Sequence, residues 1–468
     1  MTTSVSRILL IADIGGEEVR HIGDEAMLGA NLDALRSLFP GATFTVVAAD
    51  PEWASRRYGV TAVPPFGFRR DPAASAERRS LLASLLESSE RNATIDAVAN
   101  ADAVIVSGGG NLSSSWPDLL YERAALLQLA QRFGKPSVVL GQTIGPHLAE
   151  DERRLLAASL LHARFVGVRE LPSAMLGVDL GIPHERLWYQ FDDGLRVDEP
   201  VWAAPDETTI AVTIDPQLRA AGKALFASFA DQLRRLAETT GARLVLVPHA
   251  FGGEASGQPS DLTEARLLAA KIGGSRVSVV GALDVEEARR AAAGASLIIS
   301  SRYHPIVFGL IAGVPSLGVY GDDYCRIKLQ GVLTHAGLER WTVTYDDIAA
   351  GALLEASLEL WSVRDRIQKN LEGRAAAWRS ECRERWAAVR SVLVGEVAPA
   401  PPATLFGRPV EEVMPAMASA FSAQRRWFER VLASREARRR TRLQTLRRAP
   451  VRTVVRQLAK LRVRLGWS

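Results

Sequence analysis

The chain has 468 residues, of which 47% are hydrophobic and 24% charged, the composition of a globular protein long enough for about two to four domains. Its two cysteines, Cys325 and Cys382, lie far apart, which excludes a disulfide framework and a zinc signature and favours a reducing compartment. No stretch approaches the roughly 18 apolar residues that a membrane-spanning helix needs. We therefore expect a cytoplasmic protein, or one peripheral to the inner face of the cytoplasmic membrane.

The net charge of +4 is unevenly distributed. Residues 421–468 hold 15 of the 57 Lys and Arg but only 2 of the 53 Asp and Glu, a balance of +13. Residues 1–420 therefore carry a balance of −9. A mildly acidic body argues against nucleic acid as a partner.

Short apolar runs of strand length alternate with amphipathic stretches along the body of the chain. The first set of predicted strands covers 7–14, 43–49, 102–107, 137–141 and 165–168. The second set covers 209–214, 243–248, 277–280, 296–300, 316–320 and 342–345. Helical patterns occur at 24–38, 119–133, 150–163, 218–240, 261–272 and 284–293, and a long one follows at about 346–395. This alternation predicts two parallel sheets covered by helices.

Two proline-containing segments without periodicity divide the chain into predicted domains. Segment 200–206 is expected to link a first Rossmann-like domain, 1–200, to a second, 207–395. Segment 396–404 is expected to be a stiff linker before a basic extension, 405–468. Two Rossmann-like domains joined by a short linker are expected to bind ligands in a cleft between them.

The most informative motif follows the predicted strand 296–300, where residues 300–305 read Ser-Ser-Arg-Tyr-His-Pro. Arg302 is a permanent cation whose forked donors suit a carboxylate or a phosphate, and His304 is an acid/base that titrates near neutral pH. Because open α/β folds bind ligands at the carboxyl ends of strands, the pair favours chemistry on an anionic substrate. The alternative is an arginine in a salt bridge beside a structural histidine.

Glycines follow two predicted strands of the first half. Gly23 permits close backbone approach, and Asp24 lies at a helix N-terminus, which attracts anions; capping alone is the alternative. Gly108, Gly109 and Gly110 with Asn111 follow strand 102–107, and this favours a ligand loop over a plain turn. The spacing is not that of a dinucleotide-binding loop.

Polar residues follow the next two strands. Gln142 and Thr143 lie off the end of strand 137–141 and suit sugar hydroxyls, unless they form only a tight connection. Arg169 ends strand 165–168 and is expected to enter the cleft. A salt bridge with Glu170 is not expected, because neighbours on a strand point to opposite faces.

Two further features lie in the second half. His249 follows strand 243–248 and either faces the cleft or is structural. The carboxylates at 322–323, followed by Lys328, fit a solvated turn better than a metal site, because no further ligand spacing accompanies them.

In order and spacing, these motifs resemble the polysaccharide pyruvyl transferase family over roughly residues 7–390. The matching segments are Gly-Asp-Glu-Ala at 23–26, Gly-Gly-Gly-Asn-Leu at 108–112, Gly-Gln-Thr-Ile-Gly-Pro at 141–146, Val-Arg-Glu at 168–170 with Ser173, an aspartate at 192 or 193, and Ser-Arg-Tyr-His at 301–304. Two details depart from the family pattern. Tyrosine stands between Arg302 and His304, and His21-Ile22 replaces the asparagine common before Gly-Asp.

The resemblance implies a GT-B architecture of two facing Rossmann-like domains. It also implies transfer of the enolpyruvyl group of phosphoenolpyruvate to a sugar diol of a cell-surface polysaccharide or glycolipid precursor, forming a cyclic ketal and releasing phosphate. His304 would be the general acid/base, with Arg302 beside it. The donor side would comprise Arg169, Arg302, Tyr303, His249 and Lys328. The acceptor side would comprise Gly23, Asp24, Gly108, Gly109, Gly110, Asn111, Gln142, Thr143, Asp192 and Asp193.

The chemistry of the residues agrees with this resemblance. Phosphoenolpyruvate is a polyanion, for which fixed guanidinium groups are natural ligands. One histidine can exchange the protons of the reaction, typically contributing ~10²–10⁴-fold. No metal or cofactor is expected. One alternative is a GT-B glycosyltransferase or epimerase that uses a nucleotide sugar, with Glu286 or Glu287 on the ribose; another is a non-catalytic membrane-associated scaffold.

Residues 451–465 have the pattern of a basic amphipathic helix, and Trp467 follows as an interfacial anchor. The pattern is compatible with an anionic membrane surface as the partner of 421–468, and if the acceptor is a lipid-linked glycan, docking there would bring the enzyme to its substrate. Packing on the acidic body or on a second copy in a homo-oligomer is the alternative.

Overall fold

The computed structural model describes residues 5–87, 91–196, 198, 208–252, 260–399 and 401, and the backbone of 404–405 and 408–409. Met1–Pro402 form one compact unit and Ala403–Ser468 another. The predicted linker 200–206 lies outside the described residues, as does the basic amphipathic helix. Of the predicted extension 405–468, the structure describes only β18 (Arg408–Pro409) and the end of its antiparallel partner β17 (Thr404–Leu405).

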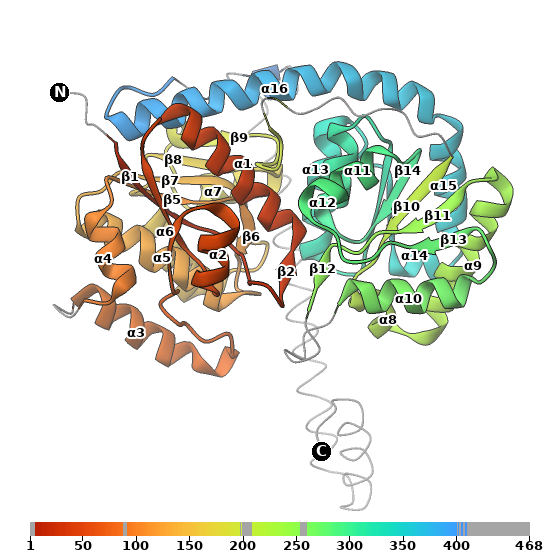
Figure 1. The fold of residues 1–468 in the computed structure, drawn as a ribbon, viewed down its shortest axis with the longest axis horizontal. Coiled ribbons are helices and arrows are strands. Elements are labelled where there is room, and N and C mark those ends of the chain that lie inside the picture. Colours follow the sequence, from red (N-terminus) through yellow and green to blue (C-terminus); the bar gives the residue numbers. More distant parts are fainter. Residues whose placement is uncertain are drawn as a thin grey trace, which may run out of the picture. The chain divides into compact units, whose positions relative to one another are not determined.

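The first unit contains two parallel sheets, and the first of these has the strand order β4-β3-β1-β5-β7-β8-β9, with β6 paired to β7. Its strands are β1 (Arg7–Ile11), β3 (Thr43–Val47), β4 (Thr61–Val63), β5 (Ala103–Val106), β6 (Gly109–Leu112), β7 (Ser137–Ile144), β8 (Phe165–Val168) and β9 (Leu187–Tyr189). Its helices are α1 (Ile22–Leu38), α2 (Pro51–Tyr58), α3 (Ser75–Glu87), α4 (Ala93–Asn100), α5 (Pro117–Arg132), α6 (Glu150–Leu160) and α7 (Leu171–Asp179). Helices cover both faces of the sheet (Figure 1).

Strand β1 shows how this sheet is stabilised on both faces. Ile8 and Leu10 belong to one buried cluster, and Leu9 and Ile11 belong to another. Alternate side chains of a strand point to opposite faces, so each face contributes its own apolar layer.

The second sheet has the strand order β13-β11-β10-β14-β15-β16. Its strands are β10 (Thr209–Thr213), β11 (Arg243–Leu246), β13 (Val277–Val279), β14 (Leu297–Ser300), β15 (Ser316–Tyr320) and β16 (Thr342–Thr344). Its helices are α8 (Pro216–Ala221), α9 (Lys223–Thr240), α10 (Asp261–Ile272), α11 (Val285–Ala293), α12 (Tyr303–Ile311), α13 (Asp323–Ala336), α14 (Tyr345–Ala349), α15 (Ala352–Ser362) and α16 (Arg364–Val394).

All eleven predicted strands are present, each within a few residues of its predicted ends. The helical region predicted over about 346–395 is confirmed and consists of α14, α15 and α16, with Gly351, at φ 94°, separating α14 from α15. The pattern 218–240 is likewise interrupted at Gly222, with φ 154°. Glycine tolerates these positive φ values without the strain of a side chain.

Two features join the halves that contain the two sheets. Strand β2 (Arg20–His21) of the first half pairs antiparallel with β12 (Ala250–Phe251) of the second. Helix α16 passes from the second sheet back to the first (Figure 1), where Trp378 stacks on Phe191 with ring centroids 4.3 Å apart.

Among the described residues, no helix is long and apolar enough to cross a membrane.

We expect Trp378→Ala to lower the free energy of unfolding by about 3–5 kcal/mol, because it removes a 4%-exposed aromatic ring from the contact between α16 and the first half. Urea denaturation of the full chain measures the effect. Leu267→Ala, at a side chain that is 43% exposed, is the control and should change stability by no more than about 0.5 kcal/mol. Equal stability losses in the two variants would contradict the role assigned to this contact.

Candidate functional site

The carboxyl end of β14 places Arg302 and His304 at the start of α12. Arg302 is the N-cap residue of this helix, and His304 lies in its first turn. Ser300 fixes the turn, because its hydroxyl accepts a hydrogen bond from the Arg302 amide at 2.9 Å and donates one to the Arg302 carbonyl at 2.8 Å. The predicted position of the pair at a strand end is therefore confirmed.

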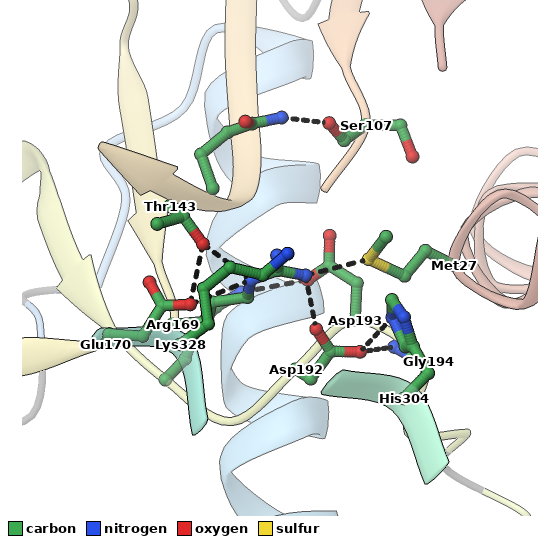
Figure 2. Close-up of polar contacts among 12 residues, drawn as sticks. Met27, Ser107, Thr143, Arg169, Glu170, Asp192, Asp193, Gly194, His304 and Lys328 are labelled. Carbon is green, nitrogen blue, oxygen red and sulfur yellow. Dashed lines mark hydrogen bonds and ion pairs between the residues drawn. The ribbon is translucent and has the colours of Figure 1, made fainter. Parts of the chain in front are cut away.

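His304 lies between groups from the first half of the chain. Its Nε2 is 3.6 Å from Oδ1 of Asp192, which is an ion-pair distance when the ring is protonated (Figure 2). On the other side of the ring, Nδ1 lies only 1.7 Å from where a Cβ of Gly23 would stand. Any side chain at position 23 would displace the histidine, so the glycine is required for this close approach.

Asp192 is fully buried and ionised. Its Oδ2 accepts a hydrogen bond from Arg169 Nη1 at 2.8 Å, and its Oδ1 accepts one from the Gly194 amide at 2.7 Å. Burial by itself would raise the pKa of Asp192, but His304, Arg169 and the Gly194 amide hold that pKa well below its usual range. The carboxylate is therefore a permanent negative charge beside the histidine.

Arg169 is 1% exposed and does not enter a cleft as expected. Its Nε contacts both Thr143 Oγ1 and Glu170 Oε1 at 3.1 Å, so the prediction that Arg169 and Glu170 would not pair was wrong. The strand ends at Val168, and beyond it the backbone no longer forces neighbouring side chains apart. The guanidinium also lies over the Tyr303 ring at 4.3 Å. Despite burial, Tyr303, Asp192 and Glu170 raise the pKa of Arg169, so it stays charged.

Glu170 connects the first half to helix α13. It accepts hydrogen bonds from Thr143 Oγ1 at 2.6 Å and Ser173 Oγ at 3.0 Å. Its side chain packs directly on Gly331 of α13, where an added Cβ would lie 2.4 Å from the glutamate Cγ. Thr143 therefore has a structural partner in addition to any ligand. Strand β7 includes Thr143 and ends at Ile144, not at residue 141 as predicted.

Arg302 adopts the salt bridge that the sequence left open as its alternative. Its Nε and Nη2 donate to the two oxygens of Asp261 at 3.1 and 2.7 Å. The arginine side chain nevertheless stays 36% exposed, whereas Asp261 is fully buried and also accepts the backbone amides of His249 and Ala250. The pair therefore fixes the position of the guanidinium on a side chain that is partly exposed.

Lys328 and Tyr324 of α13 reach across to the glycine motif of the first half. Tyr324 donates a hydrogen bond to the Gly110 carbonyl at 2.7 Å, and Lys328 Nζ lies 3.5 Å from the Tyr324 hydroxyl. A side chain at Gly110 would come within 2.2 Å of that hydroxyl. Lys328 also lies 5.5 Å from the Tyr303 ring centroid and makes no carboxylate ion pair among the residues the structure describes.

The glycine motif is not a simple loop, because Gly109–Leu112 form β6 beside β7. Gly108 approaches Asp193 so closely that a Cβ would lie 2.6 Å from its Oδ2. The amide side chains of Asn111 and Gln142 are buried, and within the described part of the chain Asn111 Nδ2 and Gln142 Oε1 lack hydrogen-bond partners. Such orphaned groups are costly unless a ligand or water satisfies them.

Asp24 belongs to a cluster that the sequence analysis did not foresee. One ligand atom each from Asp13, His21 and Asp24 lie within 4.8 Å of one another, a set that could hold a cation. Burial and the neighbouring Asp13 raise the pKa of Asp24, whereas His21, His304 and Lys328 oppose the rise.

His249 is buried and neutral. Its Nδ1 lies 3.2 Å from the Val247 carbonyl, and burial lowers its pKa to about 4. Its Nε2 has no partner in the described residues, and its backbone carbonyl accepts a hydrogen bond from the amide of Ile22 of the first half.

The remaining acidic residues named from the sequence have structural partners. Asp322 caps α13, Glu286 pairs with Arg196 at 2.7 Å, and Glu287 completes the capping box of α11.

Sequence reasoning missed two residues, one on α13 and one on α16, that contact the neighbours of Asp192 in the site. Asp193 is fully buried and pairs with Arg385 of α16 at 2.8 Å. His335 of α13 hydrogen-bonds the Arg169 carbonyl through Nε2 at 2.9 Å and stacks on Tyr189. No local pattern marks either residue, because each interacts with a segment more than a hundred positions away.

We expect Arg385→Met to cost about 3–5 kcal/mol at neutral pH, because it leaves Asp193 as a buried, unpaired carboxylate. Burial already raises the pKa of Asp193, so the carboxyl protonates as the pH falls and the deficit relative to wild type should shrink. Urea denaturation across pH measures both effects. The double variant Arg385→Met/Asp193→Asn should recover stability at neutral pH, and failure to do so would contradict the pairing.

The fold resembles solved enzymes at low sequence identity. A putative UDP-N-acetylglucosamine 2-epimerase from Listeria monocytogenes is 12% identical over 85% of this chain and 99% of its own, with a TM-score of 0.55. MnaA of S. aureus, solved with UDP, is 13% identical over 85% of this chain and 99% of its own, with a TM-score of 0.54. Anabaena HepE, solved with UDP-glucose, is 14% identical over 82% of this chain and 99% of its own, with a TM-score of 0.52. The expected GT-B fold is thereby confirmed.

No curated protein matches the chain in sequence. A family model described as polysaccharide pyruvyl transferase matches residues 21–323, which is 303 of the 468 residues. The match includes the glycine motifs, Arg169, the aspartates at 192–193 and the Arg302–His304 block. The chain therefore belongs to the polysaccharide pyruvyl transferase family.

Proposed function

We propose that the protein transfers the enolpyruvyl group of phosphoenolpyruvate to a sugar diol of a cell-surface polysaccharide or glycolipid precursor, forming a cyclic pyruvate ketal. The observation that carries the proposal is the placement of His304 beside ionised Asp192, with Arg302 two residues away and Lys328 nearby. This arrangement combines a proton-exchanging group with cations for an anionic donor. The family match supports it.

The donor meets Arg302 and Lys328. Arg302 keeps 36% of its side chain exposed while Asp261 fixes its orientation, and Lys328 has no carboxylate partner among the described residues. A carboxylate and a phosphate can each take one of these cations. Arg169 acts through its neighbours, because its guanidinium is already occupied by Asp192, Glu170 and Tyr303.

His304 exchanges the protons. Protonation of C3 of phosphoenolpyruvate gives a methyl group and an oxocarbenium centre at C2. The first sugar hydroxyl attacks C2 and loses its proton to a base, and the C2–O bond to phosphate breaks. The second hydroxyl then attacks C2, loses its proton and closes the ketal ring. Asp192, whose Oδ1 lies 3.6 Å from His304 Nε2, holds the ring in position for these transfers.

The acceptor lies toward the first half. Asn111 Nδ2 and Gln142 Oε1, which lack partners among the described residues, and the carboxyl of Asp24, whose pKa is raised by burial, suit sugar hydroxyls. His249 fits the acceptor better than the donor, contrary to its placement from the sequence. With Nδ1–H donating to a carbonyl, its Nε2 offers only a lone pair, which pairs with a hydroxyl and not with a phosphate oxygen.

Residues 421–468 would dock on an anionic membrane surface and bring the enzyme to a lipid-linked acceptor on the cytoplasmic side. The support is the charge balance of +13 in this segment. The proposed reaction consumes only phosphoenolpyruvate and the sugar diol and needs no cofactor.

A nucleotide-sugar enzyme is the competing function, because solved neighbours contain UDP or UDP-glucose in their crystals. Thermal stabilisation separates the two. Phosphoenolpyruvate should raise the melting temperature of the full chain, and an excess of a UDP- or GDP-sugar should not abolish that rise. A shift given only by a nucleotide sugar would reject the pyruvyl transfer proposal.

We expect Lys328→Met to weaken phosphoenolpyruvate binding about tenfold or more, the loss of one charge-assisted contact. The variant breaks no ion pair with a carboxylate of the described residues, so it should fold. The shift is measured against the variant's own melting temperature. Arg302→Ala should lose the shift as well, and the double variant Arg302→Ala/Asp261→Asn removes the unpaired carboxylate that could unfold the single variant. Unchanged shifts in all three would contradict the donor site.

Once an acceptor is found by phosphate release, we expect His304→Asn to lower kcat by about 10²–10⁴-fold, the usual range for a lost acid/base. Asp192→Asn should lower kcat less and leave the Km for phosphoenolpyruvate nearly unchanged, because Asp192 acts through the histidine. Full activity in His304→Asn would reject the assigned role.

A further inference from the structure

A second site lies away from His304, in a pocket of about 480 Å³ between the end of α13, the segment leading to β16, and α16. This volume is in the range of about 300–1,000 Å³ that is typical of small-molecule sites. The polar side chains that line it are Arg340, Arg366, Arg374 and Asn370, and no acidic residue lines it. Several guanidinium groups around one pocket are typical of phosphate recognition.

Helix α16 builds one wall of the pocket. Arg366, Asn370 and Arg374 recur every four residues and therefore share one face of the helix. At 1.5 Å per residue, the two arginines are about 12 Å apart along the axis. The adjacent residues Ile367 and Leu371 are buried and contribute the apolar part of the lining.

The protein only partly neutralises these charges. Arg374 Nη1 donates to the His335 carbonyl at 2.8 Å, near the C-terminal end of α13. Arg340 pairs with Glu359 at 3.0 Å, but the two side chains are 64% and 56% exposed, so solvent weakens the pair. Arg366 is exposed, and its side chain makes no ion pair or hydrogen bond among the described residues.

We propose that this pocket binds a small molecule that carries a diphosphate. Arginines from α16 and from the segment before β16 line the pocket together and no lining residue is a carboxylate, so the pocket suits a ligand that carries more than one phosphate group. The apolar lining suits the organic part of a diphosphate ester. This site uses none of the residues assigned to pyruvyl transfer, so it does not depend on that proposal.

Isothermal titration of the full chain at low salt with inorganic pyrophosphate and with UDP tests the site. Arg366→Gln should weaken pyrophosphate binding at least tenfold, the loss of one charge-assisted contact. Arg383→Gln, at an exposed arginine of α16 outside the pocket lining, is the matched control and should bind like wild type. Arg374 is not the test residue because it also caps α13.

The double variant Arg302→Ala/Asp261→Asn, which leaves no unpaired buried carboxylate, should retain pyrophosphate binding, and this separates the pocket from the His304 site. UDP binding more tightly than pyrophosphate identifies an ester as the ligand, and equal affinities identify the free diphosphate. Absence of binding to wild type, equal affinity of wild type and Arg366→Gln, or loss of binding in the folded double variant would overturn the proposal. If the protein does not bind phosphoenolpyruvate but binds pyrophosphate as predicted, only the pyruvyl transfer proposal is rejected.

Discussion

The site depends on keeping a fully buried carboxylate, Asp192, ionised. Removing a carboxylate from water costs several kcal/mol unless hydrogen bonds and opposite charge compensate. Arg169, the Gly194 amide and His304 supply that compensation from one strand end, one turn and the other half of the protein. The same interactions that stabilise Asp192 therefore determine where His304 and Arg169 lie.

The halves of the first unit meet at positions where one of them has no side chain. Gly23 receives the ring of His304, Gly110 receives the hydroxyl of Tyr324, and Gly331 receives the side chain of Glu170. In each case an added Cβ would lie between 1.7 and 2.4 Å from the partner. Gly23 and Gly110 belong to the glycine motifs of the sequence, and they bring catalytic and donor-binding candidates together by close packing, not by wrapping a phosphate.

Local pattern was enough to predict the strands and to place Arg302 and His304 at a strand end, because alternation and strand-end position are properties of short segments. It was not enough to predict Asp261 as the partner of Arg302 or Arg385 as the partner of Asp193, which lie 41 and 192 positions away. The Arg169–Glu170 contact was also misjudged, because the strand ends one residue before Arg169. Ion pairs between distant segments depend on how the strands and helices are arranged in space, which the local hydrophobic pattern does not specify.

A crystal structure of the full chain with phosphoenolpyruvate tests the account most directly. The account predicts the donor's anionic groups on Arg302 and Lys328, with C3 facing the His304 ring and the Asp192–Arg169 pair intact. A donor bound through a displaced Arg169, or away from His304, would contradict the central role of the buried Asp192 network.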